Sequence, residues 1–396
     1  PGTYALWQFG RTKEVRYWTA PDRNPWVEAP KGDVVEQFTE KLEEAVKLQS
    51  PGAVLLSGGL DSAMLVALAS KHGSLKTYSA GFADDPESEL PGAALVAKQF
   101  GTEHHEIVLS PRDVVARLAE VVAHRDAPVA RPADVALHFM AHEVSRKTNA
   151  VLTGEGSDAV LGGQRRHLAE RYGWAFRSMP TLLMVAAPLA HSRPHMQSVL
   201  ASLRTGDTYR RYVRWNGAFG LDERDQLFPG EGKQVVFDAD PRTSNLRRAL
   251  YFDQSSWLPD DVLERADRMT MAASLEARAP FLDHRLVEFV STLPDDQRVR
   301  GFATKWILRQ AARPLLGSLR PRKGGFGIQA GAWLRGELRD FMLEHLRGTG
   351  SLTRAYYEPR VLDRVLDQHL AGRRNHETLL WTLLNLEIWH RTSLQA

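Results

Sequence analysis

Short apolar runs and helical stretches alternate along the first part of the chain. The apolar runs at 53–56, 75–82, 105–110 and 150–153 have the length and composition of buried strands. Helical stretches separate them, and glycines at 73 and 101 stand where the first two would end. Strands that alternate with helices at this spacing predict an α/β fold, with a parallel sheet and helices on both faces.

The flanking parts of the chain show other patterns. Residues 4–18 alternate loosely around a polar turn, which predicts a β-hairpin, and 19–32 form a linker with three prolines. Asp33 can cap a helix with an apolar face at spacing four. Beyond residue 165 the strand pattern fades, so a mainly helical C-terminal region is predicted. We therefore divide the chain into 1–32, 33–165 and 166–396.

Composition narrows the class of protein. Of 396 residues, 43% are hydrophobic and 25% charged, as in ordinary soluble proteins. The most apolar stretch, 179–190, is too short to cross a membrane and predicts a buried core helix. The absence of cysteine excludes disulfides, zinc–thiolate sites, iron–sulfur clusters and a cysteine nucleophile within these residues. The net charge is only +3 and the basic residues are scattered, so no nucleic-acid partner is expected. Residues 1–30 lack a signal-peptide pattern, and we expect a cytoplasmic protein without membrane contacts.

The turn after the first predicted strand, SGGLDS at 57–62, is the strongest candidate for chemistry. Unpaired N–H groups at the start of the following helix form an anion site, and glycines let phosphate oxygens approach the backbone. Asp61 is out of place beside an anion unless a cation binds too, and a carboxylate beside phosphates suits Mg²⁺. A second glycine-rich segment, 154–163, follows the fourth strand. Both segments fall at strand ends, where parallel sheets bind ligands; an incidental glycine turn is the alternative.

The hexapeptide resembles the pyrophosphate loop of the N-type ATP pyrophosphatases. Together with the rest of the chain, it is similar to the synthetase domain of the asparagine synthetase family. The resemblance covers essentially the whole chain, and its most specific block is 264–289. The other segments that carry it follow in the family's order: SAGF at 79–82, GTEHHE at 101–106, VLTGEGSDAVLGG at 151–163, TKWILR at 304–309, RKGGFG at 322–327 and LLWTLLNLEIW at 379–389.

The resemblance implies a reaction and its cofactors, ATP and Mg²⁺. In this family ATP activates a carboxylate as an acyl-adenylate, and a nitrogen nucleophile displaces AMP. Asp61 and Asp158 are implied to hold Mg²⁺, and Lys305 to neutralise charge as pyrophosphate leaves. Glu155 is implied to take the proton of the attacking amine or to orient the adenylate. The residues implied to bind ATP and its pyrophosphate are Leu56, Ser57, Gly58, Gly59, Asp61, Ser62, Ser79, Gly81 and Gly154.

Structural explanations compete with several of these roles. Taken alone, Lys305 is an exposed helix lysine, and Glu155 is a helix-start charge favoured by the dipole. Four further charged residues match family positions and either support the site or form buried structural pairs; they are Asp267, Arg268, Glu276 and Arg278. We expect His104 and His105 to pack at a strand end rather than bind a metal.

The chain departs from the family pattern at two positions near the second loop. Ala159 replaces an acidic residue, and Gln164 replaces a tyrosine. These departures put aspartate as the substrate in doubt, but not adenylation. Relatives that form β-lactams carry a tyrosine at the position of Glu155. Glutamate there therefore favours an asparagine-synthetase-like reaction over lactam closure.

The nitrogen donor is a separate question. Glutamine-using relatives begin with a cysteine that hydrolyses glutamine, whereas residues 1–18 resemble only the last strands of that glutaminase domain. Most of that domain is therefore absent from the chain. Either it precedes Pro1, or the protein uses free ammonia or another amine, supplied by a separate subunit or from solution. A homodimer is left open.

Three functions compete. The first is an asparagine-synthetase-type ligase that converts aspartate to asparagine. The second is a specialised amide ligase of the same family, acting on a small-molecule or peptide carboxylate, as the macrolactam-forming cyclases of lasso peptides do. The third is a non-catalytic binding relative. Intact Asp61, Glu155, Asp158 and Lys305 argue against the third.

Overall fold

The computed structural model describes residues 2–25, 30–82, 88–128, 131–177, 210–212, 215, 226–227, 240, 242–321 and 330–393. The core helix predicted at 179–190 and the RKGGFG segment at 322–327 lie outside these residues. Among the described residues, no helix combines the length and the apolar character that a membrane span requires.

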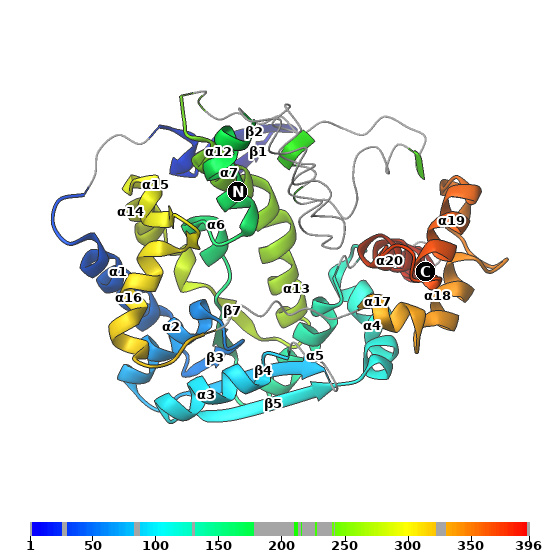
Figure 1. Cartoon of the computed structure of the whole chain (residues 1–396), viewed down its shortest axis with the longest axis horizontal. Helices are drawn as coiled ribbons and strands as arrows, with labels where there is room; N and C mark the ends of the chain where they lie inside the picture. The colour runs from blue at the N-terminus through cyan, green and yellow to red at the C-terminus, as the bar shows by residue number, and fades with distance from the viewer. Residues whose placement is uncertain are drawn as a thin grey trace.

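A five-stranded parallel sheet runs through the lower part of the molecule in Figure 1. Its strands are β3 (Ala53–Leu55), β4 (Lys76–Phe82), β5 (Glu103–Leu109), β6 (Ala150–Leu152) and β7 (Glu276–Arg278). They run in the order β5-β4-β3-β6-β7, and every neighbouring pair is parallel. The chain leaves β3 toward β4 and returns to its other side as β6. This reversal beside β3 is the point where such sheets bind ligands.

Helices cover both faces of the sheet, as predicted. On one face α1 (Val34–Gln49), α2 (Leu60–Ala69), α3 (Leu90–Phe100), α14 (His284–Thr292) and α16 (Trp306–Leu316) pack into one apolar core. On the other face α5 (Ala133–Ser145) packs on β4, and α13 (Glu264–Met271) packs on α5. The apolar side chains of the short strands are therefore enclosed by two helical layers.

Local sequence explains where several helices begin and end. The Asp33 carboxylate accepts hydrogen bonds from the N–H groups of Val35 and Glu36, which caps α1 as predicted. Gly101 ends α3 in the left-handed conformation. Ser110 and Asp113 form a capping box at the start of α4 (Pro111–Arg125).

The predicted hairpin and the helical C-terminal region are both present. Strands β1 (Thr3–Gln8) and β2 (Arg11–Arg16) pair antiparallel. Helices α17 (Ala330–Arg335), α18 (Arg339–Leu346), α19 (Pro359–Leu370) and α20 (Glu377–Ser393) share a second apolar core with α4. In Figure 1 they form the orange and red group on the right of the molecule. Trp381 of α20 is buried in this core.

Strands beyond residue 165 differ from the predicted pattern. Strand β7 extends the sheet, and β8 (Val299–Arg300) pairs with β9 (Ala303–Thr304). The helical block 264–289 is broken by β7 and by a short 3-10 turn, Pro280–Leu282. A three-residue strand with a charged residue at each end has no apolar run to reveal it. The sheet thus draws on both sides of residue 165, and the division into three stretches stays a prediction.

The remaining elements connect these layers. A π-helical segment joins α12 to α13 and contains Pro259. The bounds are α6 (Ser157–Leu161), α7 (Arg165–Arg177), α12 (Asn245–Phe252), the π-helical segment (Asp253–Leu263), α15 (Asp295–Arg298), and 3-10 turns at Pro21–Arg23, Ser70–His72 and Arg354–Tyr356.

Candidate active site

The SGGLDS segment forms the turn from β3 into α2. Gly58 has a φ of 72°, and a Cβ at this residue would lie 2.6 Å from the backbone nitrogen of Ala93. The tight approach of α3 therefore requires glycine at this position. Gly59 caps α2 without a side-chain hydrogen bond, and the first turn of α2 lines the cavity described below.

Lys305 joins the two glycine-rich loops. Its Nζ lies 2.6 Å from Asp61 Oδ2 and 2.5 Å from Asp158 Oδ1. The lysine side chain is only 5% exposed, whereas the two carboxylates are 28% and 24% exposed. Burial alone would lower the pKa of Lys305, but the two carboxylates outweigh it and raise that pKa, so the lysine is charged. The site therefore contains a buried cation between two aspartates.

Further polar groups orient both aspartates. Ser157 Oγ donates a hydrogen bond to Asp61 Oδ1 at 2.9 Å. The Gln164 side-chain amide donates to Asp158 Oδ2, so the residue that departs from the family pattern contacts the predicted metal ligand directly. A Cβ at Gly163 would collide with the Asp158 carboxylate and the Lys305 side chain. The second glycine-rich segment thus makes room for this ion pair.

Glu155 lies in the same site with a basic partner. Arg265 Nη2 of α13 lies 3.1 Å from Glu155 Oε1, and Arg265 Nε lies 3.5 Å from Asp134 Oδ1. The Glu155 side chain retains 32% exposure at the cavity wall. Burial beneath the surrounding protein nevertheless raises the pKa of Glu155, Arg265 partly opposes this rise, and Asp158 adds to it. A carboxylate with a raised pKa is a stronger base than an ordinary glutamate.

These groups surround a cavity of about 450 Å³. The cavity wall combines the charged centre with an apolar side formed by Trp257, Leu258 and Val262. Ala159, the other departure from the family pattern, lies on this side and is buried against Leu258 and Val262. The predicted residues that line the cavity are Leu56, Ser57, Gly59, Asp61, Ser62, Gly154, Glu155, Asp158 and Lys305.

The other predicted residues lie behind the cavity or away from it. Gly58 is behind the loop, and the Ser79 hydroxyl donates to the Leu56 carbonyl oxygen. A Cβ at Gly81 would lie 2.8 Å from the Leu90 side chain. These three residues shape the loop and its supporting strand; contact with ATP stays a prediction for them.

Four charged residues had competing structural explanations: Asp267, Arg268, Glu276 and Arg278. None of them is among the described residues that line the cavity. Glu276 and Arg278 pair with each other on β7 at 3.0 Å, and Arg268 pairs with Glu264 at 3.3 Å. Asp267 is exposed. Each of these pairs has one exposed and one half-buried side chain, so neither is a buried pair, and a supporting role for any of the four stays a prediction.

His104 and His105 lie in β5. His104 Nδ1 is 2.9 Å from the Thr77 hydroxyl, and the His105 ring stacks on Tyr78 with centroids 4.9 Å apart. Both therefore pack against β4, the neighbouring strand.

Sequence reasoning missed Arg265 and Ser157. Arg265 belongs to the block 264–289, in which we singled out Asp267 and Arg268 instead. On a helix, Asp267 points away from the face of Arg265, whereas Arg268, three positions on, shares much of that face, so only packing shows which arginine reaches the cavity. Ser157 stands between Gly156 and Asp158 in the second loop, and its place in that motif was the available signal.

Comparison with known proteins supports the family assignment that the two glycine-rich loops suggested. The described fold is that of an α/β protein with its candidate site at the reversal of a parallel sheet. The family model for asparagine synthase matches residues 37–391. The chain belongs to the asparagine synthase family, whose members use ATP.

Several relatives resemble most of this chain. Asparagine synthetase 1 (glutamine-hydrolyzing) of Bacillus subtilis strain 168 is 29% identical over 391 residues, which cover 93% of this chain and 61% of that protein. Asparagine synthetase 3 of the same strain is 28% identical over 305 residues, covering 72% and 46%. Amidase chyE of Penicillium rubens is 24% identical over 375 residues, covering 79% and 55%. The chain thus spans about 61% or less of the length of these relatives.

Proposed function

We propose that this chain is an ATP-dependent, amide-forming ligase that releases AMP and pyrophosphate. One observation carries the proposal. Asp61 and Asp158, from the ends of two neighbouring strands, meet at the buried ammonium of Lys305 beside the N-terminus of α2. Positive charge and the N-terminus of a helix, with carboxylates beside them, support a triphosphate site at this position.

The residues fit a magnesium ion. Asp61 and Asp158 both contact one cationic group, so oxygens from both can reach a single ion. Carboxylate oxygens are the ligands that Mg²⁺ prefers, usually together with substrate phosphates. When bound, Mg²⁺ would neutralise charge on the phosphate oxygens. Lys305, displaced from the aspartates, would pair with the phosphates.

The first step activates a carboxylate. A substrate carboxylate oxygen attacks the α-phosphorus of ATP, the bond from that phosphorus to the bridging oxygen breaks, and pyrophosphate leaves with the electron pair. Negative charge builds on the leaving pyrophosphate, and we assign its stabilisation to the Lys305 ammonium. A preorganised cation in a water-poor site stabilises such charge more than water does.

The second step forms the amide. An amine nitrogen attacks the acyl carbon of the adenylate, and AMP leaves with its oxygen. The nitrogen loses a proton, which the Glu155 carboxylate accepts; its raised pKa suits this role. Arg265 holds the carboxylate in place, so Glu155 is the candidate base and Arg265 its positioning residue.

We propose aspartate as the carboxylate substrate and ammonia as the nitrogen source, with asparagine as the product. Glu155 supports this choice, because lactam-forming relatives carry tyrosine at its position. A glutaminase domain or subunit would supply the ammonia, as the names of the Bacillus relatives suggest for those proteins.

A second candidate is a specialised amide ligase with a larger or more apolar carboxylate substrate. Two observations favour it. Ala159 replaces an acid and is buried against Leu258 and Val262, and the amide of Gln164 occupies one oxygen of Asp158. Such a substrate would be a small molecule or a peptide.

Exchange of labelled pyrophosphate into ATP tests the proposal and separates the candidates. Aspartate-dependent exchange supports asparagine synthesis. Exchange that appears only with other carboxylates or peptides, and not with saturating aspartate, supports the second candidate. If a panel of amino acids and peptides gives no exchange in the presence of ATP and Mg²⁺, the ligase proposal is wrong.

A further inference from the structure

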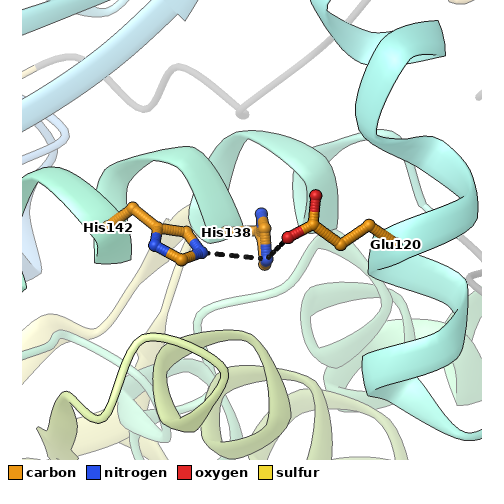
Figure 2. A group of neighbouring side chains, drawn as sticks. All are labelled: Glu120, His138 and His142. Atoms are coloured by element: carbon orange, nitrogen blue, oxygen red, sulfur yellow. Dashed lines mark hydrogen bonds and ion pairs between the residues drawn. The ribbon is translucent and has the colours of Figure 1, made fainter.

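Two histidines and a glutamate meet between α4 and α5, away from the lining of the cavity described above (Figure 2). Glu120 comes from α4, and His138 and His142 come from successive turns of α5. Their nearest ligand atoms all lie within 4.8 Å of one another. Residues four apart on a helix share a face, so α5 presents both imidazoles to α4.

The spacing of these atoms suits a metal ion. The Nε2 atoms of His138 and His142 are 3.3 Å apart, and Glu120 Oε1 is 3.8 Å from His138 Nε2. Zinc bonds in a tetrahedral site place neighbouring ligand atoms about 3.3–3.4 Å apart. The two nitrogens already have that separation, and a small side-chain rotation brings the carboxylate oxygen to it.

The surroundings hold the three side chains in orientations that suit binding. His138 is fully buried, and its polar contacts with other described residues run through Nε2, toward the cluster. Arg117 Nη1 holds Glu120 Oε2 at 2.9 Å and leaves Oε1 facing the histidines. Metal-ligating carboxylates commonly have such an orienting partner. Burial, with a smaller contribution from His142, lowers the pKa of His138 to about 4.

A hydrogen bond between two neutral histidines is the competing explanation. It accounts for the 3.3 Å contact, and the ion pair with Arg117 holds Glu120 without a metal, so zinc binding is what distinguishes the two explanations. We propose that Glu120, His138 and His142 bind one divalent transition-metal ion of the zinc class between α4 and α5. Imidazole nitrogens favour zinc over magnesium, so this site is chemically distinct from the Asp61–Asp158 pair.

The ion would fix α5 next to the candidate active site. Leu137 and Met140 of α5 line the cavity, and Asp134, one turn before His138, contacts Arg265. With three protein ligands, a water molecule would complete a tetrahedral site. Binding to the folded state alone would also stabilise the protein against unfolding.

Calorimetric titration of the tag-free, chelator-treated chain with zinc chloride, in excess Mg²⁺, tests the proposal. We expect one Zn²⁺ bound per chain. His142→Ala and Glu120→Gln should each weaken zinc binding by about a hundredfold. Loss of an outer-sphere partner of a metal ligand already weakens binding by about 10- to 100-fold, so loss of a ligand itself should reach the top of that range. The control variant His284→Ala removes an exposed histidine of α14 and should leave the affinity unchanged.

Two further measurements keep the test decisive. Circular dichroism must show that His142→Ala, whose side chain is half-buried, is folded; His138→Ala is avoided because that ring is fully buried. Cobalt(II) in place of zinc should give the intense visible bands of a tetrahedral ion. If the wild-type chain binds no zinc in the micromolar range, or if His142→Ala and Glu120→Gln bind it as tightly as the wild type, the proposal is overturned.

Discussion

Lys305 combines a left-handed backbone, with φ at 53°, and a buried side chain that contacts two carboxylates. Neither feature is favourable for lysine by itself, since bulky residues rarely adopt positive φ and lysine is seldom buried unpaired. Two ionic partners offset the cost of removing the ammonium from water. Unfavourable local conformations of this kind concentrate at functional sites, which agrees with a role in charge stabilisation.

Replacing Lys305 tests that role. Lys305→Ala should slow adenylation by roughly a hundredfold or more, because one preorganised charge near the leaving pyrophosphate is lost. Single-turnover formation of pyrophosphate measures the effect. Lys71→Ala, which removes an exposed lysine paired with Glu43, is the matched control and should keep the wild-type rate. A near-normal rate in Lys305→Ala would show that the ion pair is structural.

Asp61 is tested by removing its charge and keeping its shape. Asp61→Asn should abolish ATP–pyrophosphate exchange, since a neutral amide is a poor magnesium ligand. Far-ultraviolet circular dichroism should stay unchanged, because the side chain is part-exposed and isosteric. Asp367→Asn, an exposed residue of α19, serves as the control. Retained exchange in Asp61→Asn would mean that Asp61 does not hold the metal.

The raised pKa of Glu155 predicts how activity depends on pH. A base must be deprotonated, so the rate of amide formation should rise as pH increases through the raised pKa of Glu155. Glu155→Gln should remove this rise and lower the rate about 100-fold or more. The pH profile of amide formation from a preformed adenylate measures both effects. A rise that persists in the variant would assign the proton transfer to another group.

At the scale of elements, helix α16 determines where Lys305 lies. The hairpin of β8 and β9 leads directly into α16, whose residues Ile307, Leu308 and Ala311 are buried in the core shared with α2. Because α2 also begins at the SGGLDS loop, one packed layer fixes both the loop and the lysine. The helices on that face therefore determine the geometry of the site as well as the stability of the sheet.

The cap of α1 affects that layer without touching the site. Asp33→Ala removes the carboxylate that accepts from two N–H groups, and should reduce the free energy of unfolding by about 1 kcal/mol. Asp33→Ser, which still caps, should lose much less. Urea denaturation followed by circular dichroism measures the difference. An unchanged midpoint in Asp33→Ala would show that this cap does not contribute to stability.

At the scale of the whole molecule, the source of nitrogen is the central question. The chain spans about 61% or less of its relatives, and it contains no cysteine to hydrolyse glutamine. We expect that these 396 residues by themselves give an amide product with ammonium salts, ATP, Mg²⁺ and aspartate, and that glutamine serves only when a glutaminase domain or subunit is present. Chromatographic detection of asparagine checks this. If aspartate-dependent exchange occurs and ammonium still gives no product, the nitrogen donor is another amine.

Much of the fold is predictable from local sequence. The apolar runs at 53–56, 75–82 and 150–153 correspond to β3, β4 and β6, and the turn after β3 is where the glycines indicated. Such features depend on neighbours within a few positions: strand length, helix caps and residues that tolerate positive φ. The sequence thus determined the alternation of strands and helices and the two glycine-rich loops at their ends.

Only the tertiary structure brought distant groups together. Lys305 meets Asp61 across 244 positions, and Arg265 meets Glu155 across 110. Strand β7 exists because β6 provides a partner for it, and the cluster of Glu120, His138 and His142 exists because α4 packs on α5. Local sequence patterns predict which helix or strand contains each residue. The direction of a side chain and the residue that it contacts are determined only when those elements pack together. The loops are therefore encoded locally, while the charge at their centre is a product of the folded state.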